Sequence, residues 1–216
     1  MIRPLQAWVG ELATRARGGG VTTLEEQAIG RLIPDLLVGI WRRDPRELIR
    51  RKFTVIETHI LAHLERCGPT SPERVAEQLL IAHTDVARTL QRLTRLRVIR
   101  HRRNGTIELT GPARTAGLEI VAIEAKIRRW KRALAQAQSY QRFADESYVL
   151  VDGAQVRLTS AMEQAFRAAG VGLLLLSAGE VILGVPAARR RAYTPERVRA
   201  TDRLYHAALT TRETSI

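Results

Sequence analysis

RLTRLRVIRHRRNGTIELT, residues 92–110, is the stretch that decides the fold of the middle of this 216-residue chain. Its first part continues an apolar stripe at helical spacing, and its second part holds two short apolar-rich segments, residues 98–101 and 106–109. Asn104-Gly105 lies between these segments, and Asn-Gly in that position is a strong signal for a type I′ hairpin turn. The stretch therefore predicts the end of a helix followed directly by a β-hairpin.

Three helices are expected up to this hairpin. Residues 53–65 place their apolar side chains on one face. Ser71 can cap a second helix whose first residue is Pro72, a position that proline prefers. Thr84 can cap a third helix that runs to about residue 97. Three helices followed by a hairpin is the order of a winged helix-turn-helix domain.

The whole chain is strongly basic. It carries 35 Lys and Arg against 22 Asp and Glu, a formal charge of +13 and a pI near 11.2. This charge favours a polyanion as partner, because each phosphate that a protein neutralises releases condensed counterions. With 45% hydrophobic and 26% charged residues the composition is that of a folded protein, which excludes fibrous and wholly disordered classes.

The sequence also indicates where the protein works. A single cysteine, Cys67, excludes an internal disulfide. No signal peptide and no apolar run of membrane-spanning length is evident, so we expect a cytoplasmic, nucleoid-associated protein with no membrane partner.

The cations concentrate on the third helix and on the hairpin. Arg88, Arg92 and Arg95 share one face of the helix, away from its apolar side chains. In winged helices the N-terminal polar residues of this helix meet base edges, while cations meet phosphates. We expect base contacts from Thr84, Asp85, Arg88 and Thr89, phosphate contacts from Arg92 and Arg95, and backbone or minor-groove contacts from Arg100, His101, Arg102 and Arg103. The alternative is a solvated charged face on a protein-interaction wing.

Residues 53–110 resemble the winged-helix domains of MarR-like bacterial regulators, including the run quoted above. The resemblance implies binding to double-stranded DNA and no particular operator.

The residues on either side of the winged helix form a second pattern. We expect a helix over 4–17, strands over 21–29, 32–41 and 118–125, a helix over 128–143 and a strand over 147–151. We further expect a helix over 160–169, strands over 171–177 and 181–185, and a helix over 195–208. The prediction is an α/β (α+β) protein with a discontinuous domain of residues 1–41 and 118–190, an inserted domain of residues 42–117, and a basic C-terminal helix and tail of residues 191–216.

With residues 42–117 set aside, the order is helix, strand, strand, strand, helix, strand. Pro34-Asp35 lies in the second strand and Glu124-Ala125-Lys126 closes the third. This pattern resembles the restriction-endonuclease-like αβββαβ core of PD-(D/E)xK nucleases, and Gln136 and Tyr140 match the QxxxY feature of RecB-like members.

The residue types suit phosphodiester chemistry. Asp35 and Glu124 can hold Mg²⁺ or Mn²⁺ through oxygen ligands. Lys126, on the same face of its strand as Glu124, can orient or deprotonate the attacking water or balance negative charge. The resemblance implies Glu11 as an upstream acid, with Glu26 as the alternative, and implies that Gln136 and Tyr140 position the substrate or the lysine. The basic run of Arg128, Arg129, Lys131 and Arg132 offers an approach for a phosphate backbone.

Three functions remain open from the sequence. The favoured one is a DNA-binding protein with a Mg²⁺-dependent, endonuclease-like site. The second is a transcriptional regulator or architectural DNA-binding protein with a catalytically silent nuclease-like fold, since a fold does not fix a function. The third is a protein-interaction adaptor, which would lack DNA affinity with a steep salt dependence. A homodimer is also open, because the final strands can supply a pairing edge.

Overall fold

The computed structural model describes residues 2–14, 20–45, 52–114, 117–126 and 129–213. The chain divides into two compact units. The sheet unit comprises Met1–Arg43 and Leu118–Ala192, and the helical unit comprises Asp44–Gly117 and Tyr193–Ile216. The class is mixed α/β, as predicted, and no helix in the described part of the chain is long and apolar enough to cross a membrane.

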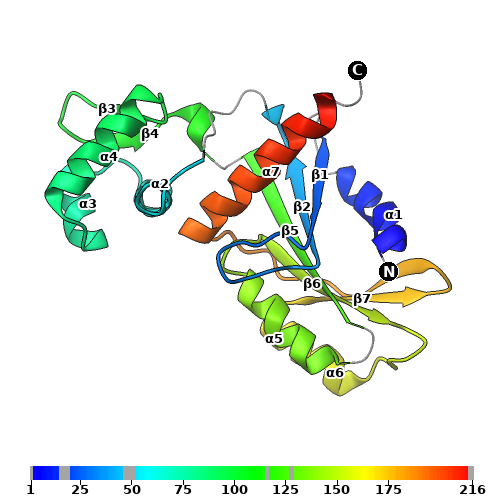
Figure 1. Cartoon of the computed structure of the whole chain (residues 1–216). Coiled ribbons are helices and arrows are strands. Elements are labelled where there is room, and N and C mark those ends of the chain that lie inside the picture. The colour runs from blue at the N-terminus through cyan, green and yellow to red at the C-terminus, as the bar shows by residue number, and fades with distance from the viewer. Residues whose placement is uncertain (1, 15–19, 46–51, 115–116, 127–128, 214–216) are drawn as a thin grey trace. The chain divides into compact units, whose positions relative to one another are not determined.

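A six-stranded mixed sheet forms the sheet unit, in the order β1-β2-β5-β6-β7-β8 (Figure 1). Pairing is antiparallel for β1 with β2, β2 with β5 and β7 with β8, and parallel for β5 with β6 and β6 with β7. The strands are β1 (Val21–Glu25), β2 (Leu36–Trp41), β5 (Leu118–Ala125), β6 (Glu146–Asp152), β7 (Gly172–Ser177) and β8 (Glu180–Val185). Each parallel pair needs a crossover, which α5 (Trp130–Tyr140) and α6 (Ser160–Ala169) provide.

Helices cover the two faces of this sheet. The helix α1 (Ile2–Ala13) packs Leu5, Trp8 and Leu12 into a core with Val121 and Ile123. Because side chains alternate along a strand, Glu124 points to the opposite face, where it contacts Tyr140 of α5.

One close approach inside the sheet requires glycine. Tyr148 of β6 stacks edge-on against Trp8 with ring centroids 5.2 Å apart, and its hydroxyl donates to Glu146 at 2.8 Å. Its ring lies directly over Gly172 of β7, where a Cβ atom would be 2.2 Å from the ring. A side chain at residue 172 would therefore displace the tyrosine.

The two first strands are shorter than the sequence predicts. Glu26 adopts a left-handed φ of 47°, and a bridge between Ile29 and Leu32 closes the connection between the strands. As a result Asp35 lies just before β2 and not inside it, and its carbonyl accepts a hydrogen bond from the Glu26 amide at 3.2 Å.

Helices dominate the second unit. Its elements are α2 (Val55–Cys67), α3 (Pro72–Leu79), α4 (His83–Arg95), the hairpin strands β3 (Ile99–His101) and β4 (Ile107–Leu109), a 3₁₀ turn (Gly111–Ala113) and α7 (Pro195–Glu213). Their shared core includes Ile60, Val75, Leu93 and Ile107, together with Val198 from α7. The C-terminal helix is therefore part of this unit, whereas the sequence had suggested a separate segment from residue 191.

Two local predictions in the helical unit have different outcomes. Ser71 caps α3, with its side chain accepting from the Arg74 amide and Pro72 at the first position, which confirms the prediction. The prediction that Thr84 caps the next helix is wrong. The helix α4 begins two residues earlier than that cap would place it, at His83 with Ala82 in the cap position, and it has no side-chain cap.

The hairpin turn also differs from the predicted type I′ turn. Its pairing ends at His101 opposite Ile107, and Gly105 has a positive φ of 80° while Asn104 does not. The Asn104 side chain instead accepts hydrogen bonds from the amide and the hydroxyl of Thr106, at 3.2 and 2.7 Å. Asparagine competes for local backbone groups in this way, and here that produces a longer loop over residues 102–106.

Candidate functional site

Three charged side chains from two distant parts of the sequence converge at one end of the β2–β5 pair. Leu36 pairs with Ile123, so the same register brings Asp35 beside Glu124. The Lys126 Nζ atom lies 2.9 Å from Glu124 Oε1 and 3.6 Å from Asp35 Oδ2. Antiparallel pairing thus brings together an aspartate and a lysine that the sequence separates by the whole helical insertion.

Glu124 is the buried member of this cluster, with 1% of its surface exposed. The Tyr140 hydroxyl donates to Glu124 Oε2 at 2.6 Å and also lies 3.0 Å from the carbonyl oxygen of Ile33. Burial, and then the hydrogen bond to Glu124, raise the pKa of Tyr140 far above its ordinary value. Tyr140 is therefore a neutral donor that satisfies one carboxylate oxygen, while Lys126 satisfies the other.

Asp35 and Lys126 form the solvent side of the cluster. Their side chains are 34% and 38% exposed, and Asp35 Oδ2 also accepts from the Ala125 amide at 2.6 Å. The hydrogen bond to Glu124 is the largest of the effects that raise the pKa of Lys126. Lys126 therefore stays an ammonium at neutral pH, which suits charge balance and water orientation and opposes a role as proton acceptor.

The donor set of this cluster fits a hard divalent cation. Asp35 and Glu124 offer carboxylate oxygens at one place, and Mg²⁺ commonly uses one or two carboxylates while keeping waters or substrate phosphates. Within the described ranges no third His, Cys, Asp or Glu joins them. Lys126 lies against both carboxylates, so a bound cation would share them with the ammonium.

Glu11 does not belong to this cluster. It is exposed on α1, the helix that covers the face lined by Val121 and Ile123, whereas Glu124 points to the other face. The sequence-based choice of Glu11 as the upstream acid is therefore not supported by the geometry. Glu26, the alternative, is exposed and bonded through its backbone to Asp35.

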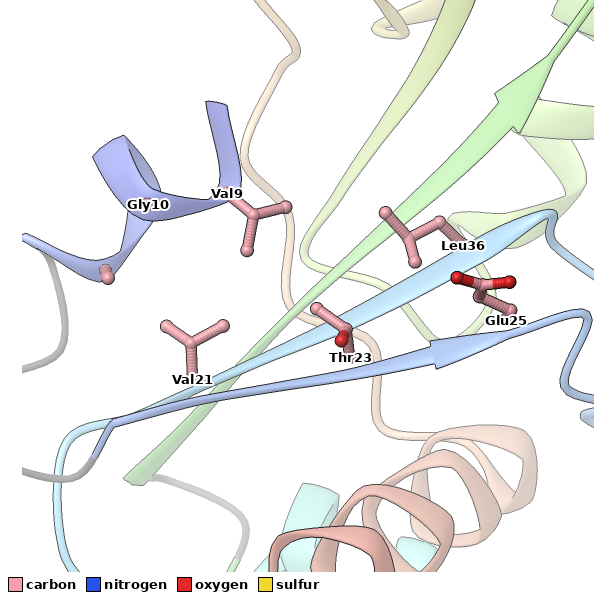
Figure 2. A pocket seen from close by; sticks show the side chains of 7 residues that line it. Val9, Gly10, Val21, Thr23, Glu25 and Leu36 are labelled. Carbon is pink, nitrogen blue, oxygen red and sulfur yellow. The ribbon is translucent and has the colours of Figure 1, made fainter. Parts of the chain in front are cut away.

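A pocket of about 300 Å³ lies between α1 and the first two strands (Figure 2). Val9 and Gly10 line it from α1, Thr23 and Glu25 from β1, and Leu36 from β2. Because Leu36 lies on the α1 face of the sheet, this pocket is separate from the Asp35–Glu124–Lys126 cluster.

The remaining predicted groups of the sheet unit lie on or before α5. Gln136, one turn before Tyr140, has a buried side-chain oxygen without a hydrogen-bond partner among the described residues. Arg129 immediately precedes α5 and is exposed, as are Lys131 and Arg132. Arg128 lies outside the described residues.

In the helical unit, Arg92 has an internal partner. Its guanidinium bonds to Glu57, a residue of α2 that is only 1% exposed. Glu57 also completes a capping box with Thr54, whose amide donates to it at 2.6 Å. Arg92 therefore ties α4 to the start of α2. The Thr54-x-x-Glu57 spacing is a readable capping signal that the sequence analysis missed.

The hairpin contains a second buried acid. Glu108 of β4 is 3% exposed, and its two oxygens accept from Arg100 Nε at 2.7 Å and from Arg102 Nη2 at 2.8 Å. These two hydrogen bonds, with that of Arg102 the larger, lower the pKa of Glu108. The alternation Ile107-Glu108-Leu109 in the sequence indicates that the Glu108 side chain points outward. It does not indicate that Arg100 and Arg102 are its partners.

The other predicted DNA contacts lie on the surface of α4 and the hairpin. Arg88 is exposed and bonds to Asp85 at 3.3 Å, while Thr84 is exposed and Thr89 half-buried. His101 contacts the Thr94 hydroxyl at 3.3 Å. Arg95 and Arg103 are exposed and form no ion pair with any residue that the structure describes.

Comparisons with known proteins add little. No family model matches the chain, and no curated protein matches it. Among solved structures, a protein of unknown function from Silicibacter pomeroyi aligns over 99% of this chain and 90% of its own, at 15% identity and a TM-score of 0.40. A likeness this distant supports no conclusion about function.

Proposed function

We propose that the chain is a DNA-binding protein with a metal-dependent phosphodiesterase site of the PD-(D/E)xK type, and that its helical unit binds duplex DNA as a winged helix-turn-helix. The observation that carries the proposal is the convergence of Asp35, Glu124 and Lys126, with Lys126 Nζ within 2.9 and 3.6 Å of the two carboxylates. The order α1-β1-β2-β5-α5-β6, with the helical unit inserted between β2 and β5, supports it.

Each residue has a role that follows from its surroundings. Asp35 and Glu124 would hold a divalent cation, which would supply Lewis-acid polarisation of the phosphodiester. Lys126 can donate to a phosphate oxygen or to the attacking water, because its ammonium is partly exposed. Tyr140 holds Glu124 in place from the buried side. The exposed Arg129 and Arg132 lie next along the chain and suit a phosphate backbone.

Binding to DNA is supported by the surface of the helical unit. Arg88, Arg95 and Arg103 project from α4 and the hairpin, and the whole chain carries a formal charge of +13. Arginines on this helix and on the wing are placed to meet phosphates on either side of a groove in a winged helix.

One observation favours a second function, that of a regulator or architectural DNA-binding protein with a silent site. The Lys126 ammonium lies against both carboxylates, and no third acid of the described residues joins them. In that case the cluster is a partly exposed ion network around the buried Glu124 that stabilises the sheet, and the helical unit alone carries the function.

The first test is cleavage of supercoiled plasmid and of single-stranded DNA with Mg²⁺ or Mn²⁺. We expect cleavage by the wild type, none by Asp35→Ala or Glu124→Ala, and none by Lys126→Ala, which should still shift a duplex on a gel. Glu11→Gln is the matched control, because Glu11 lies on the other face of the sheet, and it should cleave normally. Tight binding without cleavage under either metal would instead establish the silent-site alternative.

A further inference from the structure

We propose that Glu108 is a positioning residue that holds Arg100 and Arg102 side by side, so that the β3–β4 hairpin presents a fixed pair of guanidinium groups to a DNA phosphate. This inference rests on the proposed binding of duplex DNA by the helical unit. It assigns a role in DNA binding to Glu108, whose negative charge would repel a phosphate if the two were in direct contact.

The geometry of the hairpin brings the three side chains together. Arg100 and Glu108 are direct partners in the β3–β4 register, and Arg102 follows Arg100 on the same side of the chain. Ile107 and Leu109, the neighbours of Glu108, point into the core of the helical unit. Glu108 therefore lies on the outward face of a two-stranded hairpin, where a carboxylate is normally exposed, yet only 3% of its surface is accessible.

The two arginines remain available to a ligand. Their side chains are 68% and 48% exposed, against 4% for the carboxylate between them. A guanidinium has five N–H donors. Arg100 uses its Nε and keeps both terminal nitrogens, while Arg102 uses one hydrogen of Nη2. Each arginine can thus donate to a phosphate oxygen without leaving Glu108.

Fixing the arginines matters because they are long and repel each other. Two free arginines on a hairpin would lose rotamer freedom when they bind a phosphate, and that loss weakens binding. A shared carboxylate compensates their mutual repulsion and orders both side chains before the ligand arrives. Ordering of this kind favours a ligand that the arginines must meet in a set geometry.

The charge of Glu108 makes the proposal testable by the sign of an effect. Removing an acid from a DNA-binding surface raises affinity if charge alone matters. Removing an acid that positions two phosphate contacts lowers affinity and reduces the salt dependence, because the slope of log K against log salt is about 0.9 per phosphate contact. Positioning and simple electrostatics therefore predict opposite results for the same substitution.

We would measure binding of a fluorescent duplex by anisotropy across a salt series. We expect Glu108→Gln to weaken binding by roughly tenfold, as for the loss of one or two charge-assisted contacts, and to lower the slope by about one. Glu108→Asp, which keeps the charge on a shorter stem, should recover part of the affinity. Glu77→Gln, which removes the same charge from an exposed position on α3, should bind no more weakly than the wild type.

Circular dichroism on the same samples shows whether each variant is folded. If Glu108→Gln fails to fold, Arg102→Lys replaces it as the test, because it keeps the positive charge and loses the fork geometry. Binding of Glu108→Gln or Arg102→Lys at or above the level of the wild type would overturn the positioning role. A wild-type protein that does not bind duplex DNA at all would instead refute the proposed function itself.

Discussion

At the scale of single residues, the stability of the sheet unit depends on the hydrogen bonds of the buried Glu124 carboxylate. Its two oxygens are satisfied by one tyrosine and one lysine, and leaving a buried charged acceptor without a partner is costly. We predict that Tyr140→Phe lowers the free energy of unfolding of the sheet unit by about 1–3 kcal/mol. Urea unfolding followed by tryptophan fluorescence measures this unit alone, because Trp8, Trp41 and Trp130 all lie in it.

Tyr193→Phe is the control for this experiment. Tyr193 is 41% exposed and lies in the helical unit, so the fluorescence transition should not move. An unchanged transition for Tyr140→Phe would mean that the hydroxyl contributes nothing to holding Glu124.

At the scale of elements, the two threonines near helix starts have opposite roles. Thr54 caps α2 through a reciprocal pair of hydrogen bonds with Glu57, and Glu57 in turn bonds to Arg92 of α4. Thr84 lies inside the first turn of α4 and caps nothing. We predict that Thr54→Ala destabilises the helical unit by about 1 kcal/mol, the usual cost of a lost cap. Thr84→Ala should change it by less than about 0.5 kcal/mol.

Thermal unfolding followed by circular dichroism at 222 nm compares these two variants. Equal effects would mean that the Thr54–Glu57 capping box does not form. Glu57 would then not be held at the start of α2, where it bonds to Arg92 of α4.

At the scale of the whole molecule, the helical unit carries a buried histidine that should make its stability depend on pH. His63 is 3% exposed, and its Nε2 atom has no hydrogen-bond partner among the described residues. Burial, and then the charge of Arg66, lower its pKa below the ordinary value of 6.5. Burial also lowers the pKa of His206 in the same unit.

The direction of the pH effect follows from proton binding. When the pH falls through 6.5, the unfolded chain takes up a proton at His63 before the folded chain does, so protons favour unfolding. We predict that the melting temperature of the helical unit decreases between about pH 7 and about pH 5. His63→Leu should flatten this dependence, leaving the contribution of His206. A melting temperature that rises on acidification would contradict the buried neutral imidazole.

Much of the architecture could be predicted from the sequence, because periodicity and caps are local signals. The strand Leu118–Ala125 and the helix Ser160–Ala169 have the predicted bounds, and Ser71 with Pro72 marks the start of α3. Two of the errors are local, at the hairpin turn and at the start of α4. Asn104 turned its side chain to Thr106 and lengthened the hairpin loop, and α4 began before its expected cap.

The sequence by itself determined which residue types were available for a site, and it named Asp35, Glu124, Lys126 and Tyr140. Only the tertiary structure decided that these four meet, because the β2–β5 register joins residues on either side of the insertion. It also decided that Glu11 lies across the sheet from them, since alternation along β5 directs Glu124 away from α1. The partners of Arg92, Arg100 and Arg102 were likewise beyond the sequence, because an ion pair depends on distances between strands and helices that periodicity does not specify.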